Sequence, residues 1–284
     1  MKLEVVSIVT RDQVQIFGGF WEPRAPAPVS RAVEAWLLLP GASGAFYSQV
    51  QGPFASALAD AGYPVLTLST RGHDLAWLNR LNGKVYGLAA EIIAEAGEDI
   101  VAALDELERR GYRRIGLLGH SMGAIKGSYF LAHGGDPRIC LFVQTSGGRI
   151  GRSRWEGAPN RDKIAQELER AERLVAEGRG DELMLFEASL QGRSYFTPNA
   201  FLDRHRDDRY DTLALAAGLT VPTIFLGGSN EPEMIPPGLL EQFQAAATRA
   251  KPSAIATIEG ADHFYTGKAK EAIDAVLAFL RQME

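Results

Sequence analysis

The stretch of residues 113–132, RRIGLLGHSMGAIKGSYFLA, constrains the fold of this chain more than any other. Up to Gly119 it is short and apolar like a buried strand, and after Met122 small and apolar residues recur at helical spacing. Between the two parts lies Gly-His-Ser-Met-Gly, which fits the pattern Gly-x-Ser-x-Gly. A turn this tight forces the serine into a strained backbone conformation and leaves room only for glycine two residues before and two residues after it. The pattern therefore predicts a serine, Ser121, whose oxygen is held out above a sheet.

Strand-like and helix-like segments alternate along most of the chain. The apolar runs VEAWLLLPG, YPVLTLSTRG, RRIGLLG, RICLFVQTSG, VPTIFLGG and SAIATIEG read as strands, and amphipathic segments lie between most of them. This alternation predicts an α/β fold with a mostly parallel central sheet covered by helices on both faces. The opening residues alternate polar and apolar side chains and predict two strands around a turn at Arg11 and Asp12.

The alternation is interrupted in the middle of the chain. Residues 149–218 contain a charged amphipathic helix, RDKIAQELERAERLVAEGRGDEL, and then polar and aromatic segments without a strand signal. A chain of 284 residues fits one large domain with an insertion. We therefore predict a core formed by residues 1–148 and 219–284, with residues 149–218 inserted between two strands of its sheet.

Composition excludes several classes of partner. The formal net charge is -5 and no run of Lys or Arg is long enough to follow phosphates, so nucleic acid is not expected. No stretch approaches about 20 apolar residues, so no membrane span is expected. The single cysteine, Cys140, lies in an apolar run and fits a reducing compartment, and we expect a cytoplasmic protein. Nothing in the sequence indicates a metal or a cofactor, and the oligomeric state stays open.

The serine pentapeptide, flanked by its strand and helix, resembles the nucleophile turn of the α/β-hydrolase fold family. The order of elements resembles that family over nearly the whole chain. The resemblance implies that an acid and a histidine follow the serine, each on a loop after a later strand. It also implies that the insertion after LFVQTSG forms a helical cap over the serine.

A serine hydroxyl needs a base, and the chain holds five histidines. His263, in IEGADHFY, follows the last predicted strand, where the family places its base. We interpret His120 as a packing residue, His133 as capping a helix end, and His205, in DRHRDDR, as solvated. His73 follows an earlier strand near the expected site and is a candidate contact of the substrate.

The third member of the triad orients the imidazole. Its expected place is the loop after PTIFLGG, where the chain reads SNEPEMIPP and has no aspartate. Glu231 is the candidate and Glu233 the alternative. Asp262 adjoins the histidine in sequence and is badly placed to reach its ring.

An oxyanion hole requires two N–H donors. By position in the family, the backbone N–H groups of Ala42, in LPGASGAFY, and Met122 supply them, and Ser43 adds a hydroxyl.

The insertion offers candidate substrate contacts. Arg149 lies at its start together with Arg152 and Arg154, and is a candidate for holding an acidic group. Tyr195 and Phe196, in SYFTPNAFL, are candidates for lining an apolar pocket. The alternatives are a solvated surface for the arginines and ordinary packing for the aromatic rings.

These features predict a serine hydrolase that cleaves a carboxylic ester of a small molecule through an acyl-enzyme. Hydrolysis of a C–C bond, thioester cleavage and acyl transfer use the same triad and stay open, as does a ligand-binding protein without catalysis. A serine in place of aspartate argues against dehalogenase and epoxide hydrolase chemistry. The segment AERLVAEGRGDEL and the later Pro-Pro are similar to a branch that includes fungal siderophore esterases, which implies an ester of a bulky polar molecule.

Overall fold

An eight-stranded sheet forms the centre of the molecule in the computed structural model, which describes residues 2–23, 25, 32–190 and 192–283. Its strands, in spatial order, are β1 (Lys2–Val9), β2 (Gln15–Glu22), β4 (Val65–Ser69), β3 (Ala35–Leu39), β7 (Ile115–His120), β8 (Ile139–Thr145), β11 (Thr223–Gly228) and β12 (Ser253–Ile258). From β4 to β12 every pair of neighbours is parallel, whereas β2 is antiparallel to both β1 and β4. The predicted α/β fold and the opening hairpin are confirmed.

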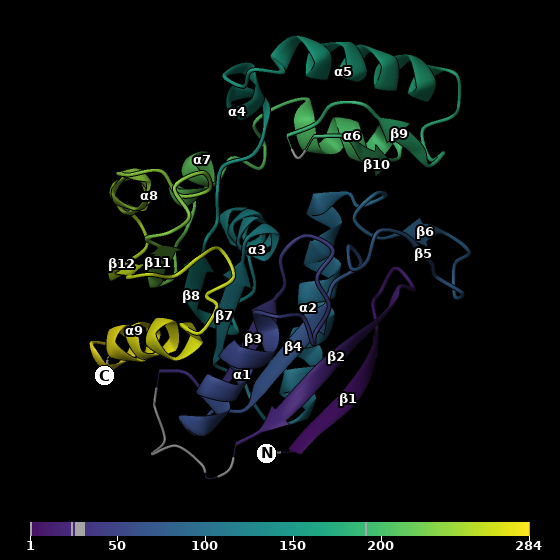
Figure 1. Cartoon of the computed structure of the whole chain (residues 1–284). Helices are drawn as coiled ribbons and strands as arrows, with labels where there is room; N and C mark the ends of the chain where they lie inside the picture. Colours follow the sequence, from purple (N-terminus) through teal and green to yellow (C-terminus); the bar gives the residue numbers. More distant parts are fainter. Residues whose placement is uncertain (1, 24, 26–31, 191, 284) are drawn as a thin grey trace.

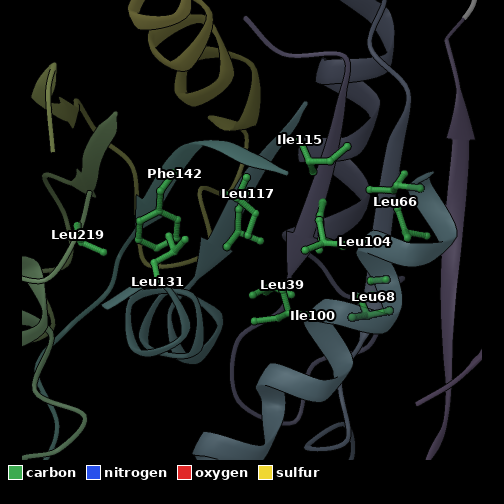
Figure 2. Close-up of a cluster of buried hydrophobic side chains, with 14 of the residues drawn as sticks. Leu39, Leu66, Leu68, Ile100, Leu104, Ile115, Leu117, Leu131, Phe142 and Leu219 are labelled. Atoms are coloured by element: carbon green, nitrogen blue, oxygen red, sulfur yellow. The ribbon is translucent and has the colours of Figure 1, made fainter. Parts of the chain in front are cut away.

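Helices cover both faces of this sheet (Figure 1). On one face α1 (Gln51–Asp60) packs against α9 (Ala269–Arg281) over Trp36 and Leu118. On the other lie α2 (Ala96–Arg109), α3 (Met122–Ala132) and α8 (Leu239–Ala246). Figure 2 shows part of the core on this second face, where Ile100 and Leu104 of α2 approach the leucines of the sheet. Because both faces are covered, β3, β4 and β7 are buried throughout their length, which explains their continuous apolar sequences.

The residues between β8 and β11 form a separate group of small elements. These are α4 (Arg152–Glu156), α5 (Arg161–Ala176), β9 (Met184–Phe186), β10 (Ser194–Phe196), α6 (Pro198–His205) and α7 (Thr212–Ala216). In Figure 1, α4 to α6 and the β9–β10 hairpin gather at the top of the view, and α7 lies lower, beside α8. The hairpin overturns our expectation that this region has no strands. Its strands have three residues each, too few for an alternation to be recognised.

A second small hairpin connects β4 to α2. It consists of β5 (Trp77–Leu78) and β6 (Val85–Tyr86), and a 3₁₀ turn, η1 (Ile93–Glu95), leads into α2. Arg71, fully buried at the end of β4, donates to Asp99 of α2 through its backbone N–H at 2.7 Å and its Nε at 3.0 Å. This ion pair fixes the end of β4 next to the site. None of the described helices combines the length and the apolar character needed to cross a membrane.

Candidate active site

Ser121 lies on the turn between β7 and α3, with φ 53° and ψ -116°. A Cβ on Gly119 would lie 2.4 Å from the carbonyl oxygen of Gly123, and one on Gly123 would lie 2.4 Å from that of Leu39. Both are backbone atoms that cannot move aside. The two glycines are therefore required by the close approach of β3, β7 and α3, as the pentapeptide predicted.

Three side chains from separate loops meet at this turn. His263 follows β12, and its Nε2 lies 3.1 Å from Ser121 Oγ. Glu231 follows β11, and its Oε2 lies 2.8 Å from His263 Nδ1. The structure thus brings together the serine, the histidine and the first of the two glutamates that the sequence offered. Glu233 is exposed and makes no hydrogen bond to His263 among the described residues.

Glu231 is held tightly from the side away from His263. The Glu231 side chain is 2% exposed, and its Oε1 accepts a hydrogen bond from the Gly228 N–H at 2.6 Å. Ser146 Oγ lies 2.6 Å from the same oxygen and 3.0 Å from the Tyr265 hydroxyl. Sequence reasoning missed Ser146 and Tyr265. Ser146 stands directly after β8, at the edge of a parallel sheet where strand ends converge, and this position was the available signal.

His120 is more than a packing residue. Its Nε2 lies 2.8 Å from the carbonyl oxygen of His263, which can only accept, so Nε2 carries the proton and donates. The side chain is 3% exposed, and burial, together with the neighbouring His263, lowers its pKa to about 4. His120 is therefore neutral near pH 7 and anchors the backbone of the loop that carries His263.

Two backbone N–H groups flank Ser121. Met122 is the first residue of α3, so its N–H has no partner within the helix. No hydrogen bond from the Ala42 N–H to another described residue is present. A Cβ on the neighbouring Gly41 would lie 3.3 Å from Ser121 Cβ, so this loop runs directly beside the serine.

A cleft of about 520 Å³ opens over these groups. Its lining comprises Gly41, Ala42, Ser43, Gly44, Ala45, Tyr47, Ser48, Gln49, Val50, Asp74, His120, Ser121, His263 and Phe264. Ser43 therefore lies where the sequence suggested, although its hydroxyl donates to the Ala42 carbonyl at 2.7 Å.

A larger cleft, of about 800 Å³, lies between the β5–β6 hairpin and α6. Neither Ser121 nor His263 nor Glu231 lines it. The larger of these two clefts is therefore not the one that contains the candidate site.

The other candidate substrate contacts do not line the cleft that contains Ser121. His73 stacks on Trp77 with ring centroids 4.8 Å apart, and Arg149 donates from Nε to Asp211 at 2.8 Å. Tyr195 is 47% exposed on β10. Phe196 follows the alternative reading of ordinary packing, because its ring is fully buried with Phe186 and Phe201 among the elements between β8 and β11.

Two further histidines have structural roles. The expectation that His205 is solvated is wrong: its ring is fully buried, and its Nδ1 lies 2.9 Å from the Phe201 carbonyl oxygen. Burial lowers the pKa of His205 to about 3, with the Arg204 charge adding to the effect. His133 caps the end of α3, as expected, through its Nδ1, 2.8 Å from the Tyr129 carbonyl oxygen. In the part of the chain that the structure describes, no group of three or more His, Cys, Asp or Glu residues could hold a metal ion.

The strained serine lies between a strand and a helix, and it faces a histidine and a buried carboxylate that follow later strands. This arrangement defines an α/β protein of the nucleophile-turn class. The model of the Alpha/beta hydrolase family matches residues 36–276, and the chain belongs to this family. A search of curated protein sequences finds no match.

Several solved structures share the fold. The alpha/beta hydrolase GrgF from Penicillium sp. sh18 is 14% identical, with 99% of each chain covered and a TM-score of 0.72. Est1E from Butyrivibrio proteoclasticus, with ferulic acid bound, is 16% identical, with 98% of each chain covered and a TM-score of 0.65. An esterase of Pyrococcus furiosus is 16% identical, covering 99% of this chain and 91% of that one, with a TM-score of 0.63. At these identities the likeness extends to the fold alone.

Proposed function

We propose that the protein is a serine hydrolase that cleaves a carboxylic ester of a small molecule. The observation that carries this proposal is the line of contacts from Ser121 Oγ through His263 to the buried Glu231. A hydroxyl within hydrogen-bonding distance of an imidazole that is itself held by a carboxylate is the arrangement that activates a serine. Family membership and the esterases among the structural neighbours support the same class of reaction.

In this mechanism Ser121 Oγ attacks the carbonyl carbon of the ester while His263 Nε2 takes the hydroxyl proton. His263 returns that proton to the alcohol oxygen, the C–O bond breaks, and an acyl group remains on Ser121. A water molecule then attacks the acyl-enzyme as His263 takes its proton. The carboxylic acid leaves and Ser121 regains its hydrogen.

Glu231 stabilises the imidazolium that forms in each half-reaction and keeps the ring in one tautomer. Since Gly228 and Ser146 hold Oε1, Oε2 stays aimed at His263. The N–H groups of Ala42 and Met122 stabilise the negative oxygen of the tetrahedral intermediate, and the N-terminal end of α3 adds its dipole.

We further infer that residues 149–218 act as the cap of the core formed by residues 1–148 and 219–284. Contacts at one loop support this inference. Asp203 of α6 accepts from the Ile93 N–H at 2.9 Å, and the Thr197 N–H donates to the Ala89 carbonyl at 2.7 Å. The partner is a small acyl substrate. The single cysteine, a free thiol, favours a reducing compartment, and we retain the cytoplasm as the proposed location.

Hydrolysis of p-nitrophenyl butyrate by the wild type and matched variants tests the proposal. Ser121→Ala should lower kcat/KM by roughly 1,000-fold or more, and Glu231→Gln by a comparable factor, because each removes a member of a unit that acts together. Ser7→Ala and Glu233→Gln are the matched controls and should retain the wild-type rate. Full activity in folded Ser121→Ala would overturn the proposal, and loss of activity in Glu233→Gln alone would transfer the role of the acid.

A further inference from the structure

The cleft over Ser121 carries a negative charge on its rim and no fixed positive charge. Asp74 is its only acidic lining residue, and no Lys or Arg lines it within the part of the chain described. His120 is neutral because burial lowers its pKa to about 4. Arg149, which the sequence offered as a candidate for holding an acidic group, is instead paired with Asp211. A carboxylate or phosphate on a substrate would therefore meet repulsion from Asp74 and no cationic side chain at the rim of this cleft.

Asp74 is held in place by its backbone and by its neighbours. Its φ is 56°, in the left-handed region, and its N–H donates to the Ser43 carbonyl at 2.9 Å. The Leu88 N–H donates to its carbonyl oxygen at 3.0 Å, and its Oδ2 lies 2.9 Å from His73 Nδ1. His73 in turn stacks on Trp77. Together these contacts fix one carboxylate oxygen of Asp74 at the rim of the cleft.

The other carboxylate oxygen, Oδ1, has no hydrogen-bond partner among the described residues, and the side chain is 62% exposed. Two aromatic rings share the cleft with it: Tyr47 is 68% exposed and Phe264 is 46% exposed. A carboxylate together with exposed aromatic faces attracts ammonium groups, through charge and through the ring quadrupole.

We propose that Asp74 is a specificity-determining residue that selects substrates with a cationic group, such as a quaternary or protonated amine, near the ester. The inference rests on the proposed function, because it assigns the substrate class of the same cleft. Tyr47 and Phe264 contact the apolar surface of that ammonium group, while Asp74 supplies the countercharge.

Binding to Ser121→Ala tests this inference without requiring turnover. The probes are butyrylcholine and 3,3-dimethylbutyl butyrate, which have the same shape and differ in one positive charge. By calorimetry, the cationic ester should bind about 10-fold more tightly than the neutral ester at low salt, and the difference should shrink at high salt. Adding Asp74→Asn should abolish the difference; asparagine tolerates a positive φ, so this variant should fold.

Asp162→Asn, which removes an exposed carboxylate on α5, is the matched control and should leave the preference unchanged. Equal binding of the two esters, or a preference that survives Asp74→Asn, would overturn the inference. Wild-type turnover of the same two esters separates the two proposals. Hydrolysis without charge preference leaves the proposed function standing, whereas cation-dependent binding without any hydrolysis contradicts the proposed function alone.

Discussion

At the scale of single residues, backbone strain is concentrated at the candidate site. The described non-glycine residues with positive φ are Gln13, Ser43, Asp74, Ser121, Ser146 and Tyr265. All except Gln13 belong to the candidate site. Three of them line the cleft, Ser146 contacts Glu231, and Tyr265 contacts Ser146. Such conformations cost about 1–3 kcal/mol each and persist only where surrounding contacts enforce them. Five of them at one place indicate that the fold gives up stability to fix these groups.

Only one of these five could be predicted from the sequence. The glycines at positions 119 and 123 predict the backbone strain at Ser121. Nothing near Ser146 or Tyr265 does so, because their conformations follow from how β8 and the His263 loop meet in space. The roles of Glu231 and His263 could be proposed from their order after successive strands. The choice between Glu231 and Glu233 depended on side-chain directions that the sequence does not contain.

The buried His120 makes a prediction about pH. Its pKa in the folded chain, about 4, lies below the ordinary value of 6.5, so the unfolded chain binds the proton first as pH falls. The free energy of unfolding should therefore decrease as pH drops from 6.5 toward 4 and receive no further loss from this group below that. His120→Gln keeps a donor for the His263 carbonyl and removes the titration.

Urea unfolding at several pH values measures this effect. In His120→Gln the slope of stability against pH between 4 and 6.5 should be shallower by up to about 1.4 kcal/mol per pH unit. His205, whose pKa is lowered to about 3, contributes a slope of the same sign that remains in the variant. Identical slopes in wild type and variant would show that His120 does not titrate in this way.

At the scale of elements, sequence periodicity predicted the long members well and the short ones poorly. The strands of the sheet and helices α2, α5 and α9 follow from apolar spacing over 5 to 16 residues. The β5–β6 and β9–β10 hairpins have strands of two or three residues, whose pairing depends on the surfaces beneath them. Phe196 is an example. Its ring packs with Phe186 and Phe201, and the sequence pattern did not distinguish this buried cluster from the lining of a pocket.

Two glycines in helices allow the effect of close packing on stability to be compared with the effect of helix propensity. In α3, a Cβ on Gly123 would meet the carbonyl oxygens of Leu39 at 2.4 Å and Pro40 at 2.6 Å. In α1, a Cβ on Gly52 would meet nothing within 4 Å. Gly123→Ala should therefore destabilise by about 1–3 kcal/mol through forced backbone shifts. Gly52→Ala should change the stability by less than about 1 kcal/mol, because the gain in helix propensity is opposed by the ring of Pro53, which crowds a Cβ on the residue before it.

Thermal or urea unfolding of the two variants gives the comparison. Gly123→Ala should also lose ester hydrolysis, since the Ser121 turn must move, whereas Gly52→Ala should keep it. A Gly123→Ala protein with wild-type stability and activity would contradict the close packing of β3 against α3.

At the scale of the whole molecule, a buried charge cluster connects α3 to α6, which lies in the segment between β8 and β11. Glu91, before η1, forms ion pairs with Lys126 of α3 and, at 3.5 Å, with Arg204 of α6. All three side chains are about 1% exposed, and Lys126 Nζ also donates to Thr70 at 2.8 Å. The Arg204 guanidinium lies 5.2 Å from the centre of the Phe196 ring. The helix that follows Ser121 is thereby tied to the proposed cap.

Removing the carboxylate should be costly because it leaves the buried Lys126 and Arg204 without the negative charge that both contact. Glu91→Ala should lower the free energy of unfolding by about 3–5 kcal/mol. The exposed Glu172→Ala on α5 should change it by less than about 0.5 kcal/mol. Replacing Glu91, Lys126 and Arg204 together by methionine should restore most of the stability. A Glu91→Ala protein as stable as the wild type would show that the cluster does not connect the two parts.

The central claim is that Ser121 is a nucleophile activated by His263, and intact-mass spectrometry after exposure to a fluorophosphonate tests it most directly. The wild type should gain the mass of one phosphonyl group, Ser121→Ala should gain none, and His263→Ala should react far more slowly or not at all. His133→Ala should react like the wild type. An unmodified but folded wild type, or an adduct that persists in Ser121→Ala, would contradict the account.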